Sequence, residues 1–354
     1  MAVSPAGGRR QVFVCCHLRR SVEPPEAVVA ALAHAFGSAS DVRGVERLSG
    51  GCKDTYRVEL GEETVVVAFP REPWYEESFA LEPALMRLVH RETSLPVPRV
   101  LASDVFGARP YHVTEYVDAP DLRGRFAACP RATQAALLEA AGRVLAELHG
   151  GVRFESSGPL RREGGEVTVD PALTWPAFLS TLVERWLTEL DESRFADLRG
   201  TFETALTPES FLSVAPDPVC LHFDYAPGNL LARGDAIVGV VDWGFAVSGH
   251  AEYDLFQFEK NFLLGEVRDP AVRDELRPHV YAGYRERGDL APGWERRRAF
   301  YRVAYKLASM RSFHRWAGSG SQRGELVTRL RAELETDLER LDEYERGREP
   351  TGQD

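Results

Sequence analysis

The sequence predicts an α+β fold built from two lobes, a small strand-rich N-terminal lobe and a larger, mainly helical C-terminal lobe. The first part of the chain carries short alternating and β-branched runs separated by glycine turns, which is typical of antiparallel hairpins. From Pro130 onward, apolar residues recur at helical spacing over long segments. The stretch Asp118-Ala119-Pro120 separates these two parts. Ligand sites commonly form between such units.

The N-terminal lobe is expected to begin with a short helix over 25–37, where Ala, Val and Leu recur at helical spacing before a glycine. Gly50 and Gly51 indicate a turn before the second strand. A second helix is expected over 77–91, and its true start is placed near Pro83, because proline disrupts a helix interior. The expected strands cover 45–48, 55–60, 64–69, 100–103 and 111–117.

The C-terminal lobe is expected to be helical except at two places. Residues 151–172 are polar and glycine-rich, which indicates an exposed loop. Residues 219–243 contain two short strand-like runs. The expected helices cover 130–150, 175–190, 192–206 and 325–345. The predicted organisation is an N-terminal extension (1–24), an N-terminal lobe (25–117) and a C-terminal lobe (118–350).

Composition excludes several classes of function. The net charge of -11 argues against nucleic acid as the main partner, which would favour a basic face. No stretch approaches the ~20 apolar residues that cross a bilayer, so no membrane partner is expected. The five cysteines form no C-x-x-C pair, so neither a zinc site nor a disulfide framework is indicated and a cytoplasmic location is expected. The run Gln11 to Leu18 is short for a signal-peptide core.

One segment, from His222 to Asp242, concentrates polar residues beside apolar strands. Asp224 and Asn229 are five residues apart, and Asp242 ends a valine-rich run thirteen residues after Asn229. Taken alone, Asp224 and Asp242 are typical of turns and Asn229 of a helix cap. Their joint occurrence, with a histidine upstream and Trp243 directly after, indicates a shared chemical site.

Phosphoryl transfer needs this kind of residue set. A base or orienting group holds the attacking hydroxyl, hard oxygen ligands hold Mg²⁺ against the phosphates, and positive charge offsets the charge on the transferring group. Asp224 and Asn229, followed by Asp242 at a strand end, supply the first two parts. The catalytic loop of protein kinases has the same five-residue step. We therefore predict transfer of a phosphoryl group from a nucleotide to a small-molecule hydroxyl.

The same segment resembles the aminoglycoside phosphotransferase family, whose members phosphorylate antibiotics and small metabolites. The family's pattern reads His-Gly-Asp, four residues, Asn, a short hairpin, Ile-Asp-Trp and Tyr-Asp-Leu. The chain departs from it at Phe223, where glycine is usual, and at Val241, where isoleucine is usual. The resemblance covers roughly residues 45–260. The matching runs are His222 to Leu231, Val241 to Trp243 and Tyr253 to Leu255.

The resemblance implies a two-lobed protein-kinase-like fold and roles for several residues of the C-terminal lobe. It implies Asp224 as the catalytic base, and Asn229 and Asp242 as ligands of Mg²⁺. His222 would order the loop, and Asp254 would tie the C-terminal lobe together. ATP or GTP would be the phosphoryl donor, and a hydroxylated small molecule the acceptor.

The resemblance also implies nucleotide contacts in the N-terminal lobe. Gly50 and Gly51, just before Lys53, stand where a phosphate-covering loop belongs. Glu115 and Tyr116 fall in the hinge between the lobes, whose backbone groups would meet the adenine edge. Glu82 is the candidate for a helix glutamate that pairs with a basic residue on the third strand.

That third strand departs from the family. Ala68 falls where a lysine or arginine is expected, and such a cation offsets phosphate charge in a dry cleft. Arg71 lies at an odd offset from Ala68, which points its side chain to the other strand face. Lys53 is one of only three lysines in the chain. We hypothesise that Lys53 supplies the missing charge.

Two other functions are compatible with the residues. Ala68 and Phe223 favour a catalytically weak or silent nucleotide-binding pseudokinase of the same fold. The presence of Asp224, Asn229 and Asp242 argues against this alternative. A metal hydrolase built on Asp224, Asp242 and His222 is the third candidate. The resemblance leaves the acceptor open, because family members act on choline, homoserine, sugars and macrolides as well as aminoglycosides. A monomer and a homodimer are both compatible with the sequence.

Overall fold

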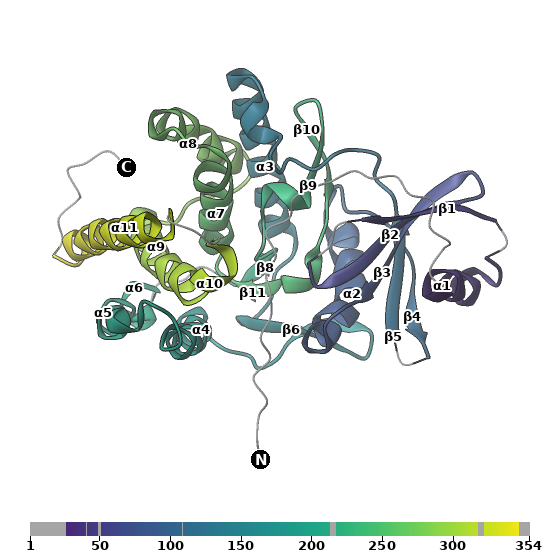
Figure 1. Ribbon diagram of the computed structural model, residues 1–354, viewed down its shortest axis with the longest axis horizontal. Coiled ribbons are helices and arrows are strands. Elements are labelled where there is room, and N and C mark those ends of the chain that lie inside the picture. The colour runs from purple at the N-terminus through teal and green to yellow at the C-terminus, as the bar shows by residue number, and fades with distance from the viewer. Residues whose placement is uncertain are drawn as a thin grey trace, which may run out of the picture.

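The computed structural model describes residues 26–39, 41–48, 51–107, 109–212, 217–317 and 322–346. The predicted N-terminal extension 1–24 and Gly50 lie outside these ranges. The predicted α+β fold is confirmed, because a five-stranded antiparallel sheet with two helices joins a larger body of helices (Figure 1). In the part of the chain that the structure describes, no helix is long and apolar enough to cross a bilayer.

The N-terminal sheet has the strand order β1-β2-β3-β5-β4, and all neighbouring strands are antiparallel. Helix α1 (Glu26–Phe36) precedes the sheet, and α2 (Glu76–Glu92) connects β3 to β4. The last strand ends close to the predicted lobe boundary after residue 117. The strands are β1 (Val42–Leu48), β2 (Lys53–Leu60), β3 (Glu63–Pro70), β4 (Val100–Phe106) and β5 (Arg109–Glu115).

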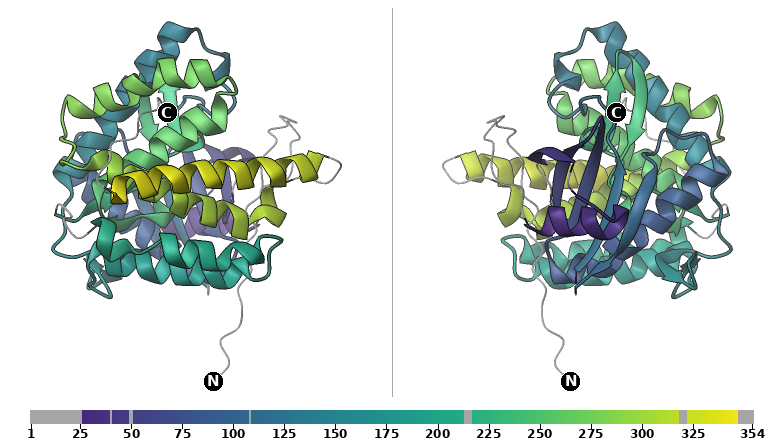
Figure 2. Two further views of the ribbon diagram at one scale, coloured as in Figure 1. Left: turned by 90° about the vertical axis from the view of Figure 1, so that its left-hand side faces the viewer. Right: turned by 90° about the vertical axis from the view of Figure 1, so that its right-hand side faces the viewer.

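The central strand β3 is covered on both faces, which explains its continuous apolar sequence. Val67 and Phe69 belong to one core cluster with residues of α1, which lies across the outer face of the sheet (Figure 2). Ala68 faces the other way and packs with Tyr75 and Phe79 around the start of α2. Successive side chains of a strand point to opposite faces, so β3 separates the core under α1 from the core under α2.

Helix α2 contains Pro83 in its interior, so the prediction that it starts near Pro83 was wrong. Proline removes one helix hydrogen bond and clashes with the carbonyl group four residues earlier, at a cost of about 3 kcal/mol. Buried side chains on both sides of the proline, including Phe79, Leu85 and Val89, offset this cost. Tertiary packing therefore carries the helix through a residue that would end it in isolation.

The C-terminal lobe is built mainly of helices, and two of them cross very closely. A Cβ atom on Gly142 would lie 2.7 Å from the backbone nitrogen of Tyr284, and one on Gly283 would lie 2.0 Å from the carbonyl oxygen of Glu139. Glycine on each helix thus permits the crossing of α3 and α8. The helices are α3 (Arg131–Gly151), α4 (Trp175–Leu190), α5 (Arg199–Ala205), α6 (Pro208–Leu212), α7 (Ala251–Glu259), α8 (Pro270–Arg285), α9 (Trp294–Arg311), α10 (Phe313–Trp316) and α11 (Gln322–Glu345).

Residues 151–172, which the sequence predicts as an exposed loop, contain a hairpin instead. Strands β6 (Gly158–Glu163) and β7 (Glu166–Val169) pair with each other. Strand β6 also pairs with β11 (Val247–Gly249), which pairs in turn with β8 (Val219–Leu221). The prediction was wrong because this sheet joins segments that are far apart in the chain, and a polar, glycine-rich run carries no strand signal of its own.

The predicted helix over 192–206 is interrupted. The chain forms a 3₁₀ turn at Ala196–Leu198 before α5 begins. This interruption allows Phe195 to turn inward, where it is fully buried and packs edge-on against Phe313 with ring centroids 5.3 Å apart. Burial of one aromatic ring therefore decides where the helix starts.

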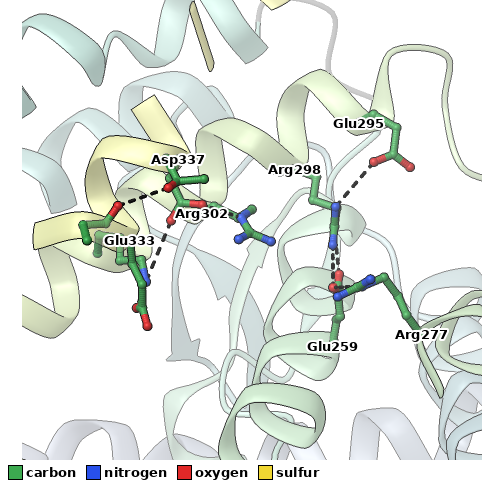
Figure 3. Close-up of polar contacts among 10 residues, drawn as sticks. Glu259, Arg277, Glu295, Arg298, Arg302, Glu333 and Asp337 are labelled. Carbon is green, nitrogen blue, oxygen red and sulfur yellow. Dashed lines mark hydrogen bonds and ion pairs between the residues drawn. The ribbon is translucent and has the colours of Figure 1, made fainter. Parts of the chain in front are cut away.

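Buried ion pairs tie the last helices to the rest of the lobe (Figure 3). Glu259 of α7 accepts hydrogen bonds from Arg298 of α9 at 2.8 and 2.5 Å and from Arg277 of α8 at 3.0 Å. Arg302 of α9 donates to Asp337 of α11 at 2.8 Å. Burial alone would raise the pKa of Glu259, but Arg298 and the other donors lower it to about 2. These pairs connect α7, α8, α9 and α11 to one another.

Candidate active site

The segment from His222 to Asp242, which we call the motif, forms a loop followed by a hairpin. After β8 the chain passes through Asp224 and a 3₁₀ turn at Pro227–Asn229. Strands β9 (Leu230–Arg233) and β10 (Ala236–Val240) then pair antiparallel, and Asp242 follows β10. The N–H group of Val241 donates to the carbonyl oxygen of Asn229 at 3.0 Å. The hairpin therefore returns the chain to Asn229 directly before Asp242.

Asp224 and Asn229 are in direct contact. The side-chain nitrogen Nδ2 of Asn229 donates to the backbone carbonyl of Asp224 at 2.8 Å and to its carboxylate Oδ2 at 3.2 Å. Asn229 is buried, whereas Asp224 is partly exposed. Because these bonds use the amide nitrogen, the amide oxygen of Asn229 is the atom that can hold a cation.

His222 and Asp254 hold this loop in place. Asp254 of α7 is fully buried, and its carboxylate accepts the backbone N–H groups of His222 at 2.6 Å and of Phe223 at 2.9 Å. The ring Nε2 of His222 lies 3.0 Å from the carbonyl oxygen of Val241. His222 thus connects the two halves of the motif, and Asp254 connects the loop to α7. Both contacts agree with the roles that the resemblance implied.

Two residues of the motif have a left-handed backbone. Phe223 has φ +64° and Asp242 has φ +67°, and no other non-glycine residue among those described has a positive φ. Phe223 stands where the family has glycine, and a side chain in this conformation costs about 1–2 kcal/mol. Its ring stacks on Tyr253 with centroids 5.0 Å apart, which offsets part of the strain. Strain of this kind clusters at functional sites.

The N-terminal lobe contributes Lys53 and Glu82 to the same place. The amine of Lys53 lies 2.8 and 3.0 Å from the two carboxylate oxygens of Glu82, and 2.7 Å from Oδ1 of Asp242. The backbone N–H of Trp243 also donates to Glu82 at 3.1 Å. Lys53, Glu82 and Asp242, which we call the charge cluster, therefore join β2, α2 and the end of the motif.

Electrostatics favours the charged forms of Lys53 and Asp242, whereas burial raises the pKa of Glu82. Burial alone would lower the pKa of Lys53, but Asp242 and Glu82 hold it well above its usual range. Burial alone would raise the pKa of Asp242, but the charge of Lys53 holds it below its usual range. Removing one partner from such a buried set leaves an uncompensated charge, at a cost of about 3–5 kcal/mol.

The sheet register explains how Lys53 reaches this position although Ala68 occupies the third-strand site. In the pairing of β2 with β3, Lys53 lies opposite Pro70 and Thr55 lies opposite Ala68. Partners opposite one another share a sheet face, as do residues two apart on one strand. Lys53 and Ala68 therefore project from the same face, and Lys53 reaches Glu82 from the second strand instead of the third.

Arg71, the alternative source of charge, makes other contacts. Its guanidinium donates to the carbonyl oxygens of Gly51 and Lys53, both at 3.0 Å, and to Asp54 at 3.1 Å. Arg71 thus holds the glycine turn against the start of β2. The geometry favours Lys53 over Arg71 as the cation that pairs with Glu82.

The predicted hinge residues lie at the end of β5. The N–H of Glu115 donates to the carbonyl of Arg99 at 3.0 Å, and the N–H of Tyr116 donates to the carbonyl of Thr64 at 3.3 Å. The backbone N–H groups of these two residues are therefore used within the N-terminal lobe. The N–H of Val117 has no acceptor among the residues that the structure describes.

The structure adds two residues that sequence reasoning missed. Tyr75 is fully buried, and a Cβ atom on Gly244 would lie 1.7 Å from its hydroxyl oxygen, so the ring packs directly on the chain after Asp242. The second is Arg123, whose guanidinium lies against Gly228 of the motif. Tyr75 lies in the 3₁₀ turn just before α2 and Arg123 in the segment after the hinge, so no periodic pattern in the sequence marked either residue.

The geometry does not support a metal hydrolase built on Asp224, Asp242 and His222. His222 is fully buried, and its Nε2 faces a backbone carbonyl group. Within the described ranges, no group of three or more His, Cys, Asp or Glu side chains could hold a metal ion. The motif therefore lacks the protein ligands that such an enzyme would need.

Comparison with known proteins gives the same picture as the geometry. A model of the phosphotransferase enzyme family matches residues 44–300, which include the motif, the charge cluster and the hinge. Two solved structures are of thermostable mutants of the aminoglycoside phosphotransferase APH(4)-Ia, in ternary complexes with hygromycin B. The one with ADP has a TM-score of 0.59 at 18% identity and covers 92% of this chain and 100% of that chain. The one with AMP-PNP has a TM-score of 0.60 at 17% identity, and covers 89% and 98%.

A macrolide 2'-phosphotransferase from Brachybacterium faecium is also similar, with a TM-score of 0.53 at 17% identity over 88% of this chain and 98% of that chain. At these identities the likeness concerns the fold. The family model, in contrast, spans most of the chain and contains every predicted site residue. The chain therefore belongs to the phosphotransferase enzyme family and has the kinase-like fold of the aminoglycoside phosphotransferases.

Proposed function

We propose that the protein transfers the γ-phosphate of ATP to a hydroxyl group of a small molecule. The observation that carries this proposal is the charge cluster, because it connects the N-terminal lobe to the motif at Asp242. Kinases need such an ion pair between a lysine and a helix glutamate in place to hold the phosphates. Here the pair of Lys53 and Glu82 is present although Ala68 occupies the third-strand position.

Asp224 is proposed as the residue that positions the attacking hydroxyl and accepts its proton. The hydrogen bond from Asn229 orients its carboxylate, and the partial exposure of Asp224 makes it accessible to an acceptor. Phosphoryl transfer passes through a loose transition state, so orientation of the hydroxyl contributes more than the strength of the base. Asp254 accepts the backbone N–H groups of His222 and Phe223, and these hydrogen bonds fix the loop that carries Asp224.

Mg²⁺ fits the donor atoms of Asn229 and Asp242. The amide oxygen and the carboxylate are hard ligands, and Mg²⁺ usually takes one or two protein ligands together with phosphate oxygens and water. When bound, the ion would neutralise charge on the phosphate oxygens. The chain itself holds the two ligands together, through the backbone hydrogen bond from Val241 to Asn229.

ATP is the proposed donor, and GTP is the second choice. The similar APH(4)-Ia structures contain ADP or AMP-PNP, which supports an adenine nucleotide. We expect the backbone of Glu115, Tyr116 and Val117 to meet the adenine edge. Gly51 and Lys53 are expected to cover and hold the phosphates, together with Gly50.

The second candidate is a nucleotide-binding pseudokinase that is weak or silent in catalysis. The left-handed Phe223 favours it, because the bulky side chain replaces glycine directly before Asp224. The buried charge cluster and the intact contact between Asp224 and Asn229 oppose it.

The acceptor class is proposed as an aminoglycoside-like antibiotic or a hydroxylated metabolite. A cytoplasmic location and a monomer or homodimer are proposed with it.

The decisive experiment measures ATP consumption with Mg²⁺ over a panel of hydroxylated metabolites and antibiotics. We expect at least one compound to raise consumption well above the background, and Asp224→Ala to abolish the increase. Calorimetric titration with ATP separates the candidates. Binding without any stimulated turnover supports the silent protein, and the absence of nucleotide binding contradicts both.

A further inference from the structure

Arg123 lies in the segment that follows the hinge, and its guanidinium lies directly against Gly228. A Cβ atom on Gly228 would lie 1.9 Å from Nη2, 2.5 Å from Cζ and 2.6 Å from Nε of Arg123. Gly228 immediately precedes Asn229, a proposed ligand of Mg²⁺. An exposed cation therefore lies beside the place where the phosphates are expected.

The backbone around Arg123 is held rigidly on the motif. The N–H of the buried Leu122 donates to the carbonyl oxygens of Pro227 at 2.9 Å and Leu230 at 3.2 Å. The carboxylate of Asp121 accepts the N–H of Arg123 at 2.9 Å. A side chain presented from a fixed backbone binds a ligand at a lower entropic cost than one on a mobile loop.

A second contact anchors the same segment to the helical body. The N–H of Gly124 donates to Glu266, which follows α7, at 2.9 Å. The backbone on both sides of Arg123 is therefore fixed, by the loop on one side and by the helical body on the other.

We propose that Arg123 is a second phosphate-binding residue of the nucleotide site, acting from the C-terminal lobe while Lys53 acts from the N-terminal lobe. The inference rests on the proposed function, because it needs a nucleotide in the cleft. A guanidinium presents a planar fork of donors that matches phosphate oxygens and keeps its charge at every relevant pH. Gly228 is required by this arrangement, since any side chain there would occupy the space of the guanidinium.

Titration calorimetry with adenosine, AMP, ADP and ATP in Mg²⁺ tests the proposal. Arg123→Ala should weaken ATP and ADP binding about 10- to 100-fold, as expected for lost charge-assisted hydrogen bonds, and leave adenosine binding unchanged. The matched control is Arg125→Ala, which removes an exposed arginine two residues along and should change none of the four affinities.

The other outcomes are equally informative. An equal loss for adenosine and ATP would overturn the proposal in favour of a contact to the nucleoside, and unchanged ATP affinity in Arg123→Ala would overturn it outright. If the wild-type protein binds no ATP, the proposed function fails before Arg123 is tested.

A double-mutant cycle with Gly228→Ala guards against misfolding. The added methyl group should weaken ATP binding when Arg123 is present, because it displaces the guanidinium. In the Arg123→Ala background the same change should have little effect, since the space is then empty. Neighbouring residues that share one interaction give such non-additive effects. Additive losses in the two variants would show that Gly228 and Arg123 act independently and would overturn the proposal.

Discussion

The two halves of the candidate site are specified in different ways. In the C-terminal lobe, Asp224, Asn229 and Asp242 lie close together in the chain, and hydrogen bonds join Asn229 to Asp224 and to Val241, the residue before Asp242. In the N-terminal lobe, Lys53 and Glu82 are 29 residues apart and meet only because α2 packs on the sheet. The C-terminal half depends on particular residues at a fixed spacing in the chain. The N-terminal half depends on a positive charge close to Glu82, and here β2 supplies that charge instead of β3.

The largest expected effect comes from breaking the C-terminal half. Asp224→Ala should lower kcat about 10²- to 10⁴-fold, as for a lost general base, while ATP affinity changes little. Steady-state kinetics and nucleotide titration would measure both quantities. Asp235→Ala is the matched control, because Asp235 is an exposed carboxylate in the turn between β9 and β10. Comparable activity in the Asp224 variant and the wild type would contradict the assignment.

Breaking the N-terminal half should have a somewhat smaller effect. Lys53→Ala should lower kcat/KM about 10²- to 10³-fold, because a preorganised charge at the phosphates is lost. Moving the lysine, in the variant Lys53→Ala/Ala68→Lys, should restore at least part of the activity, since both positions project from the same sheet face. Arg71→Ala should reduce activity less, because Arg71 contacts the turn and not Glu82.

The lysine variants need a stability measurement beside the kinetics. Lys53→Ala leaves Glu82 buried without its cation, and the free energy of unfolding should fall by about 3–5 kcal/mol. Denaturant unfolding would separate this loss from the catalytic one. If Lys53→Ala loses stability but keeps the kcat and KM of the wild type, Lys53 has only a structural role.

In the N-terminal half, His112 should make the free energy of unfolding depend on pH. This buried residue lies opposite Ala68 in the sheet and stacks on Phe79 with centroids 4.6 Å apart. Burial, helped by the charge of Lys53, lowers the pKa of His112 to about 3. As the pH falls, His112 therefore takes up a proton in the unfolded chain before it does so in the folded protein. Its contribution to the free energy of unfolding is fully present above about pH 6.5 and is lost as the pH decreases toward 3.

His112→Gln and His112→Phe should both remove this contribution. The slope of the free energy of unfolding against pH should decrease by up to about 1.4 kcal/mol per pH unit in that window. Chemical denaturation at pH 7, 6, 5 and 4 would measure it. An unchanged slope in both variants would show that His112 is not held neutral beside the charge cluster.

The smallest expected effect concerns the left-handed Phe223. Comparing Phe223→Gly with Phe223→Ala isolates the backbone, because both variants lose the ring that stacks on Tyr253. The glycine variant should be more stable by about 1 kcal/mol, since glycine adopts positive φ without strain. Thermal unfolding would compare them. A more stable alanine variant would mean that the loop relaxes to a different backbone when the ring is removed.

Local signals in the sequence account for most of the fold and for the C-terminal half of the site. Alternation identified β2, a β-branched run identified β3, and helical spacing identified α3 and α11. The errors have a common origin in long-range contacts. The hairpin of β6 and β7 needs β11 as a partner, and α2 continues through Pro83 because its face is buried.

By itself, the sequence determined the α+β class, the family resemblance and the spacing of Asp224, Asn229 and Asp242, because turns, periodicity and local spacing are properties of adjacent residues. Only the tertiary structure decided which cation pairs with Glu82. Strand register places Lys53 and Ala68 on one face, and register depends on pairing between strands. The same holds for Arg123, whose approach to Gly228 depends on the path of the chain after the hinge.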